Sequence, residues 1–586
     1  MKNNKTILLL QILSIFPLII FTLIYVNSSV YSLFFVLLLI VSLTYNTYRY
    51  TKKLQLISYP LLPILVGSFL LYAYNNLGSK GTPQSYEVLH HKIHPIATFT
   101  FQNEQNIDQL CYNIGINKKV DFYLESLENN RWKKIYQYEN KFPYSFRWEC
   151  SDIKTSTSKI RLVTTKNQMM LNELHFLSKE NSLSYTTDKK KLNDEQHIAI
   201  DTSYYSGMFF DEIYHSRTAY EIMRGIKVYE NTHPYLGKLL IIPGIKLFEM
   251  TPFGWRFTNV LFASFLILVV YYFSLQIFRK KLFAFTASFL VTYSFMHLTQ
   301  SRIGLIDTFG VLFVFISYFY LYKFIQEQRL RLLFLSGVFF GLASAVKWTA
   351  VFAALGFVLT ALYLLIVRYP LKKQFKGYKL ILYGLLSYGL LAIFVYALTF
   401  YDIYIQTGSL EKILDYQLNM FNYHSAVTSI HPYGSPWWSW PLNYKPMCYY
   451  REEVGVLYSS INAFGNPAIF WTGTISILYL FYKQIKSSTL ESSFILLAFM
   501  GLFLPYMFIG RQMFIYHFYY AVPFMILAIV YLARDIIEKY PQNQKYLLFY
   551  LALTSILFLA YYPALTGYEV YKEYINMLRW LPKWWL

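Results

Sequence analysis

Apolar residues in the chain gather into runs of about 17–22 residues, and short polar segments separate these runs. An α-helix needs a run of about this length to cross the hydrocarbon core of a bilayer. The first run follows Lys2 and Lys5 and ends near Val26, as a signal peptide does. No small-residue cleavage site follows it, however, and another apolar run begins near Val30. We therefore interpret the first run as a span that the protein retains.

The pattern predicts about thirteen membrane-spanning helices in all. After the run that ends near Val26, they lie at about 30–47, 57–75, 257–277, 283–299, 303–323, 332–346, 350–367, 380–400, 463–483, 493–509, 517–534 and 546–562. Basic residues concentrate in connections between alternate spans, for example at 279–281, 368–379 and 483–486. Because Lys and Arg accumulate on the cytoplasmic side, we place the N-terminus inside and the C-terminus outside. Segments 201–256 and 401–462 are then external loops.

Residues 80–200 follow a different pattern. Short stretches such as 97–101, 121–124 and 159–164 alternate apolar and polar residues, and polar or turn-forming clusters such as 128–130 separate them. A period of two is typical of half-buried strands and predicts an extracytoplasmic β-sandwich. Its closing stretches resemble the end of discoidin-like, galactose-binding-like jelly rolls. Glycan binding and a purely structural insertion are the two alternatives for this domain.

Three parts are therefore expected: three spans in 1–79, the sandwich in 80–200, and a helical core in 201–586. Charged residues make up 15% of the chain, against about 25% in soluble proteins, which also indicates a membrane protein. The net charge of +21 would suggest nucleic acid in a soluble protein. Most Lys and Arg lie in the short connections, so we interpret the charge as a topology signal and predict no nucleic-acid partner.

The three cysteines give no metal-binding spacing, and no HExxH motif occurs, so we predict no metal site. Cys111 and Cys150 both lie in the predicted external sandwich, where a disulfide is compatible with the compartment. Cys448 is left over.

Asp211 and Glu212 form an acidic pair among aromatic residues on the predicted external face. Ionisable groups near membrane depth are costly and indicate function. Basic residues lie close to apolar helix ends on the same face: Lys238, Arg256, Arg302, Lys347 and Arg511. A carboxylate can take a proton from an acceptor hydroxyl while cations hold a lipid-linked sugar phosphate. Because phosphate is a good leaving group, this chemistry requires neither a general acid nor a metal.

Some of these residues have simpler interpretations. Arg302 could pair with Asp307, five residues further along. His215 and His233 lie in loops beside carboxylates, where they could bind a ligand or accept hydrogen bonds. An ordinary loop or core histidine is the commoner case.

The chain resembles the protein O-mannosyltransferases in several segments. Phe210-Asp211-Glu212 resembles the acidic motif of that family, and His233–Lys238 resembles its HPPLGK segment. Further segments follow in the family's order: Gln300–Asp307 (RIxLLD), Val346–Trp348, His431–Leu442 (SPWWSWPL), Gly465–Pro467 and Gly510–His517 (R-x-x-F-x-Y-H). The resemblance covers about 205–535. Any one motif is weak, but the shared order is specific.

The resemblance implies a polytopic GT-C glycosyltransferase that inverts configuration. It implies transfer of a mannose-like sugar from a polyprenyl-phosphate donor, as substrate and without a cofactor, to a Ser or Thr hydroxyl of an exported protein. Asp211 would be the catalytic base and Glu212 would help to position the acceptor. Expected donor phosphate ligands are Arg256, Arg302, Lys347, Arg511, Lys238 and His233. Expected acceptor or sugar contacts are His215, His431, Trp437, Trp438, Trp440, Tyr516 and His517.

The chain also departs from the family. Loop 401–462 is too short for the MIR domain of eukaryotic members, which favours a bacterial plasma-membrane enzyme with an extracytoplasmic active site. HPPLGK reads His-Pro-Tyr here, and the sandwich precedes the acidic pair, where an acceptor would approach. A glycan, lipid or wall-polymer acceptor, as in aminoarabinose transferases, is therefore the alternative. A transporter is less favoured, because the charged residues lie at span ends rather than at the midplane.

Overall fold

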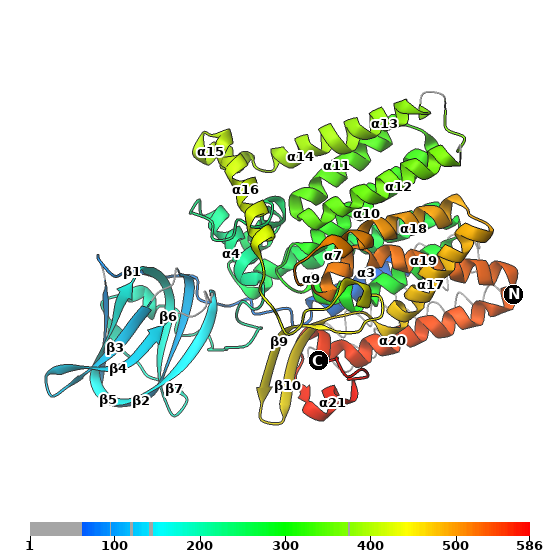
Figure 1. The fold of residues 1–586 in the computed structure, drawn as a ribbon. Helices are drawn as coiled ribbons and strands as arrows, with labels where there is room; N and C mark the ends of the chain where they lie inside the picture. Colours follow the sequence, from blue (N-terminus) through cyan, green and yellow to red (C-terminus); the bar gives the residue numbers. More distant parts are fainter. Residues whose placement is uncertain (1–60, 94, 118–120, 140–144, 368, 373–374) are drawn as a thin grey trace, which may run out of the picture. The chain divides into compact units, whose positions relative to one another are not determined.

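The computed structural model describes residues 61–93, 95–117, 121–139, 145–367, 369–372 and 375–586 (Figure 1). These residues divide into two compact units. The sheet unit comprises Asn76–Tyr229 and Ile241–Phe257, and the helical unit comprises the residues up to Asn75, Glu230–Leu240 and Thr258–Leu586. The first two predicted spans lie outside the described residues.

Six helical segments in the described part of the chain are long and apolar enough to cross a membrane. They are α7 (Pro252–Phe278), α10 (Asp307–Glu327), η2 with α12 (Trp348–Ile366), α13 to α14 (Tyr378–Leu398), α18 with η6 (Leu490–Phe508) and η8 with α20 (Pro541–Thr566). The pair α8 (Lys281–Thr292) and α9 (Phe295–Ser301), bent by 56°, would make a seventh. These helices confirm a multi-span membrane protein, whereas the total of thirteen spans stays a prediction.

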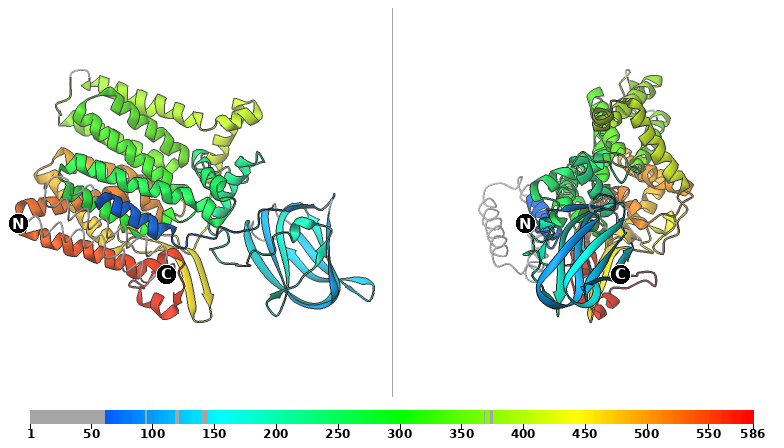
Figure 2. Two further views of the ribbon diagram at one scale, coloured as in Figure 1. Left: turned by 180° about the vertical axis from the view of Figure 1, so that it is seen from behind. Right: turned by 90° about the vertical axis from the view of Figure 1, so that its left-hand side faces the viewer.

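Four further helices coincide with predicted spans: α3 (Leu61–Tyr74), α11 (Leu330–Val346), α17 (Pro467–Lys486) and α19 (Val522–Lys539). Local sequence accounts for the starts of two helices, α17 and α18. The Asn466 side chain accepts a hydrogen bond from the backbone N–H of Ala468 and caps α17. Thr489 and Ser492 form a reciprocal capping box at the start of α18 (Leu490–Phe503). Figures 1 and 2 show these helices running side by side in the helical unit.

Helix α12 (Ala353–Ile366) packs closely against α18, and two glycines allow this approach. A Cβ at Gly501 would lie 2.4 Å from the Cα of Gly356. The backbones therefore touch without intervening side chains. The ends of this helix pair are η2 (Trp348–Phe352) and η6 (Leu504–Phe508), and both reach the cavity described below.

The predicted external loop 401–462 contains regular structure. It holds α15 (Tyr401–Thr407), α16 (Leu410–Ala426) and η5 (Trp437–Ser439), and then the hairpin of β9 (Met447–Val454) and β10 (Leu457–Ala463). A short strand, β11 (Val570–Tyr571), pairs with β10, and α21 (Lys572–Met577) follows it.

The sheet unit contains an antiparallel sheet with the strand order β1-β6-β2-β5-β3-β4. Its strands are β1 (Glu87–His90), β2 (Ile96–Asn117), β3 (Asp121–Glu128), β4 (Arg131–Glu139), β5 (Arg147–Lys166) and β6 (Gln168–Ser178). Two short strands, β7 (Asn181–Ser182) and β8 (Thr186–Thr187), pair with β6 and β2. The predicted sandwich has two sheets, whereas these strands pair as one. The long strands β2 and β5 run through register shifts between Thr100 and Gln105 and between Ile107 and Gln109, where bulges bend a strand. The galactose-binding-like assignment stays a prediction.

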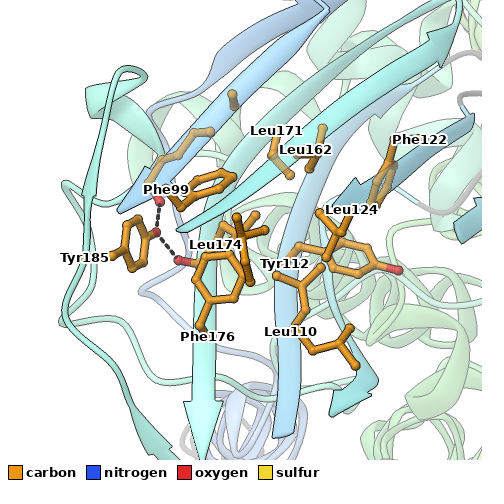
Figure 3. Close-up of a cluster of buried hydrophobic side chains, with 14 of the residues drawn as sticks. Phe99, Leu110, Tyr112, Phe122, Leu124, Leu162, Leu171, Leu174, Phe176 and Tyr185 are labelled. Atoms are coloured by element: carbon orange, nitrogen blue, oxygen red, sulfur yellow. Dashed lines mark hydrogen bonds between the residues drawn. The ribbon is translucent and has the colours of Figure 1, made fainter. Parts of the chain in front are cut away.

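One face of this sheet carries a hydrophobic core, as the alternation of apolar and polar residues predicts. Every second residue of β3 from Phe122 to Ser126 is buried. Figure 3 shows part of the cluster, and the residues labelled there come from β2, β3, β5, β6 and the segment after β7. Within it, Tyr185 donates to the backbone carbonyls of Leu174 and Leu192 at 2.5 and 2.9 Å. This satisfies the one polar atom of a buried aromatic side chain.

The chain enters and leaves the sheet region through adjacent backbone segments. The N–H of Ser79 donates to the carbonyl of Tyr205 at 2.7 Å, and the N–H of Phe253 donates to the carbonyl of Ser79 at 3.1 Å. The Asn76 side chain also donates to the Tyr204 hydroxyl at 2.6 Å. Three segments of the sheet unit are therefore joined at one place.

A disulfide joins Cys111 of β2 to Cys150 of β5, and the two residues are direct partners across the strands. The bond closes a loop with a sequence separation of 39 residues. We expect the Cys111→Ala/Cys150→Ala variant of the full chain to lose roughly 2–4 kcal/mol of unfolding free energy in the sheet unit. Thermal unfolding with and without reductant measures this loss.

Cys448→Ala is the matched control, because that cysteine is free in the structure. A double variant as stable as the oxidised wild type would contradict the stabilising role of the disulfide.

Candidate active site

Asp211 stands at the start of α4 (Glu212–Met223), in the sheet unit, and the backbone N–H of His215 donates to its carbonyl at 3.1 Å. Phe210, directly before it, has a φ of +48°. Bulky residues rarely adopt this left-handed conformation, and such strain concentrates at functional sites. Asp211 is half-buried, whereas His215 is buried within α4. The local backbone therefore marks the same position as the acidic motif.

Glu212 is fully buried and makes a bidentate ion pair with Arg256. Nε and Nη2 of Arg256 donate to the two carboxylate oxygens at 2.7 and 2.8 Å. The guanidinium also donates to the carbonyls of Leu77, Tyr204 and Gly207 at 2.8, 2.9 and 3.0 Å. One guanidinium therefore holds both the Glu212 carboxylate and the backbone segments where the sheet region begins and ends. The sequence predicted Arg256 as a phosphate ligand, but these donors already have partners within the protein.

Arg302, in the helical unit, has partners of a different kind. Its guanidinium donates to the carbonyls of Tyr72, Ala73 and Asn75 at 2.6–3.2 Å and to that of Thr566 at 3.4 Å. These carbonyls lie at the C-terminal ends of α3 and α20, where helices leave acceptors unsatisfied. Arg302 thus joins two helix ends.

The sequence suggested Asp307 as a partner for Arg302, and this pairing is corrected by the structure. Asp307 pairs with Lys347, whose Nζ lies 2.9 and 3.0 Å from the two carboxylate oxygens. Lys347 comes from the end of α11, forty residues away, which proximity in sequence did not reveal.

A cavity of about 820 Å³ opens within the helical unit. Four chain segments line it: the start of the HPYLGK segment, the residues around Lys347, the C-terminal end of α16 with the residues after it, and 508–513. The cations and imidazoles of its wall come from His233, Lys347, His424 and Arg511, and Gln512 lies beside Arg511. Three of the predicted phosphate ligands thus meet here, from parts of the chain up to 278 residues apart. Arg302 and Lys238 do not line this cavity.

Lys238 is fully buried and supports the cavity wall from behind. It pairs with Glu230, and its Nζ donates to the carbonyl of His233 and to the Tyr416 hydroxyl at 3.0 Å each. Nδ1 of His233 lies 3.1 Å from Glu230. Burial lowers the pKa of His233, and the Glu230 carboxylate opposes only part of this shift. We therefore expect His233 to face the cavity in its neutral form.

The SPWWSWPL-like loop is hydrogen-bonded to the segment that carries Arg511. The N–H of Ser435 donates to the carbonyl of Met513 at 2.9 Å, and the N–H of His431 donates to the side chain of Gln512. The indole of Trp440 then donates to the Ser435 hydroxyl at 3.0 Å. Two motifs that lie about eighty residues apart in sequence therefore form one structural element.

The predicted sugar and acceptor residues differ in exposure. Trp438 is 59% exposed, and His431 is exposed as well. Trp440 is fully buried, and its ring stacks on His517. Tyr516 is also buried, and its ring stacks on that of its neighbour His517. Trp437 is half-buried against Phe503. The exposed residues are available to a sugar, whereas the buried ones pack within the protein and do not line the cavity.

His424 is a cavity residue that the sequence interpretation missed. Its ring bonds to Arg511 at 3.1 Å and to the carbonyl of Thr232 at 2.7 Å. It follows Tyr416 and Met420, both buried, at steps of four residues on α16. This spacing places the three side chains on one face of the helix, and the sequence could have identified His424 from it.

Three carboxylates cluster in the sheet unit. Ligand atoms of Glu173, Asp194 and Glu195 lie within 4.8 Å of one another. Both oxygens of Glu173 already accept hydrogen bonds, from the side chain of Gln196 at 2.5 Å and from the N–H of Glu195 at 2.9 Å. Burial raises the pKa of Glu173 to about 7. The carboxyl therefore serves to fix the loop rather than to offer a metal ligand.

Two family models match the helical part of the chain. The model described as "Dolichyl-phosphate-mannose-protein mannosyltransferase" matches residues 232–400, and that described as "C-terminal four TMM region of protein-O-mannosyltransferase" matches residues 409–584. Together these segments cover more than half of the chain and include all four segments that line the cavity.

Curated proteins and a solved structure agree with these matches. The chain is 25% identical over 455 residues to the polyprenol-phosphate-mannose–protein mannosyltransferase of Mycolicibacterium smegmatis, covering 64% of this chain and 87% of that protein. It is 24% identical over 449 residues to the Mycobacterium tuberculosis protein of the same name, covering 64% and 86%. The S. cerevisiae protein O-mannosyltransferase Pmt1-Pmt2 complex bound to the sugar donor matches with a TM-score of 0.56 at 14% identity, over 64% of this chain and 89% of that chain. This likeness shows a shared fold.

The buried Glu212–Arg256 pair generates a prediction on stability. Arg256→Met leaves the Glu212 carboxylate buried without its cation, and we expect it to lower the free energy of unfolding by about 3–5 kcal/mol. Arg256→Met/Glu212→Gln removes both charges and should recover part of that loss. Thermal unfolding in detergent measures both variants.

Lys280→Met is the matched control, because the Lys280–Glu538 pair is largely exposed and should contribute little. If Arg256→Met unfolded at the same temperature as Lys280→Met, the pair would not stabilise the sheet unit.

Proposed function

Because this chain belongs to the protein O-mannosyltransferase family, we propose that it transfers mannose from a polyprenyl-phosphate donor to a Ser or Thr hydroxyl of an exported protein. The observation that supports this proposal best is the cavity in the helical unit. Lys347, Arg511 and His233 come from three separate family-like segments, and all three line it. A cationic cavity in a membrane protein suits a lipid-linked phosphate.

The donor phosphate is the leaving group of the proposed reaction. As the bond between C1 of the sugar and the phosphate oxygen breaks, negative charge grows on the phosphate. Arg511 and Lys347 would stabilise this charge. Because both cations are already in place, little free energy would be spent on reorganising them during the reaction. Asp307 offsets part of the charge of Lys347, so Arg511 would supply the larger share. His233, in its neutral form, would donate or accept a hydrogen bond.

Asp211 is the proposed base. It would take the proton from the acceptor hydroxyl as the oxygen attacks C1 from the face opposite the phosphate, which inverts the configuration there. Glu212 is not proposed as the base, because Arg256 holds both of its oxygens. Its proposed role is to hold the start of α4, and so Asp211, in place.

The remaining predicted phosphate ligands receive other roles in this proposal. Arg256 joins the segments that surround Glu212, Arg302 joins two helix ends, and Lys238 neutralises Glu230. Each already makes several charge-assisted contacts with the protein. We therefore propose a smaller phosphate site than the sequence predicted.

The disulfide in the sheet unit supports an extracytoplasmic site, because such bonds persist in oxidising compartments. The sheet region is inserted directly before the acidic pair, and we propose that it helps to select the acceptor. This keeps a second candidate, a glycan or wall-polymer acceptor. Mass spectrometry of secreted proteins and of wall polymers, with and without the gene, distinguishes the two.

Asp211→Asn should lower kcat about 10²–10⁴-fold and leave the donor KM nearly unchanged, since the amide cannot take the proton. Mannose transfer from a synthetic polyprenyl-phosphate donor to a Ser/Thr peptide measures this. Asp415→Asn, which removes one member of an exposed ion pair with Lys412, is the control. Retained turnover in Asp211→Asn would exclude this residue as the base.

Arg511→Ala should raise the donor KM about 10–100-fold, because it removes one or two charge-assisted hydrogen bonds to the phosphate and their binding free energy. Arg511→Lys should fall between the variant and the wild type, because it keeps the charge and loses the planar guanidinium. The same transfer assay, run at varied donor concentration, gives both values. Unchanged donor kinetics in Arg511→Ala would remove this residue from the phosphate site.

A further inference from the structure

The cations of this protein differ in what neutralises them. Arg256, Lys238 and Lys347 each pair with a carboxylate. In the part of the chain that the structure describes, no carboxylate pairs with Arg511. Its guanidinium contacts an imidazole instead, that of His424, at 3.1 Å. Arg511 therefore keeps its full charge in the wall of the cavity.

The two hydrogen bonds of His424 determine its tautomer. A carbonyl only accepts hydrogen bonds, so Nε2 must carry the proton that is donated to Thr232 at 2.7 Å. A guanidinium only donates, so Nδ1 must present its lone pair to Nη1 of Arg511. Both bonds require the neutral ring. A protonated ring would place an N–H against the guanidinium and lose the contact with Arg511.

The surroundings keep this ring neutral. The His233 ring packs edge-on at 5.2 Å, and Trp348 lies on another side at 6.4 Å. Burial first, and then the neighbouring His233 ring and the cations of Arg511 and Lys347, lower the pKa of His424 to about 4. The nearby carboxylate of Glu230 contacts His233 and Lys238 rather than His424.

We infer that His424 is a positioning residue that holds Arg511 toward the donor phosphate without neutralising it. Arg511 lies in an irregular segment between η6 and η7 (Ile515–Tyr520), so no helix fixes its direction. His424 stands on a seventeen-residue helix and is tied to the HPYLGK segment through Thr232. A carboxylate in its place would orient Arg511 equally well but would compete with the phosphate. This inference rests on the proposed function, because it takes the phosphate as the ligand.

Two substitutions separate the two bonds of His424. Asn places its side-chain oxygen where Nδ1 lies, so His424→Asn keeps an acceptor for Arg511 and loses the bond to Thr232. Gln places its amide where Nε2 lies, so His424→Gln keeps the bond to Thr232 and loses the acceptor. Tyr423→Phe, on the exposed side of the same helix turn, is the control.

We expect His424→Gln to weaken binding of polyprenyl phosphate, and to raise the donor KM, about tenfold with little change in kcat. His424→Asn should stay within about threefold of the wild type. In an Arg511→Ala background, His424→Gln should add no further loss, because the group that it positions is gone. If Asn is impaired as much as Gln, or Gln is spared, His424 serves only to anchor α16 and the inference is wrong.

A second measurement needs no change at His424. The donor is a phosphodiester and does not titrate near pH 4, so its charge stays constant. In the wild type, the affinity for the donor should fall as the pH drops toward about 4, where the ring becomes protonated. Arg511→Ala should lack this fall, because without Arg511 the protonation of His424 or His233 only adds positive charge to the cavity wall. An equal fall in both proteins would overturn the inference.

The binding measurement keeps the two proposals distinct. If the wild type binds polyprenyl phosphate but transfers no mannose, the proposed reaction fails while the role of His424 is still decided by the variants. If transfer occurs and the His424 variants behave alike, the role of His424 fails alone.

Discussion

Charges buried in this protein are stable only beside a partner, and this constraint organises both units. Moving an unpaired carboxylate or ammonium group into apolar surroundings costs several kcal/mol. Glu212 with Arg256, Glu230 with Lys238, and Asp307 with Lys347 meet this constraint, and each pair is at most one-tenth exposed. Each pair also fixes a segment with a family-like motif. The positions of the motifs therefore depend on these contacts more than on helix propensity.

The same constraint distinguishes structural cations from functional ones. A cation that a carboxylate neutralises has little attraction left for an incoming phosphate, whereas a cation held by neutral groups keeps its field. Arg511 is of the second kind and lines the cavity, whereas Arg302 donates to carbonyls at two helix ends and does not line it. Charge alone, read from a sequence, does not separate these cases. The identity of the partner does.

Much of the fold follows from the sequence, because its signals are periodic and local. Apolar runs predicted the helices of the core, and alternation predicted the strands of residues 80–200. Pairing across long distances was harder. The sequence suggested Asp307 for Arg302, but the chain brings Lys347 to it from the next helix. The pairing of the strands as one sheet, and the register shifts between β2 and β5, are likewise not revealed by alternation. The sequence made the Cys111–Cys150 bond possible, and the strand register, in which the two residues are direct partners, accounts for it.

The joined ends of the sheet region have a consequence for how such a chain can evolve. Ser79 and Tyr205 are hydrogen-bonded neighbours, although more than a hundred residues lie between them. A segment whose ends meet adds little loop-closure entropy to its host, however long it is. It can be gained, lost or exchanged without rethreading the helices. Relatives that share this helical core can therefore differ completely in what they carry at this point of the chain.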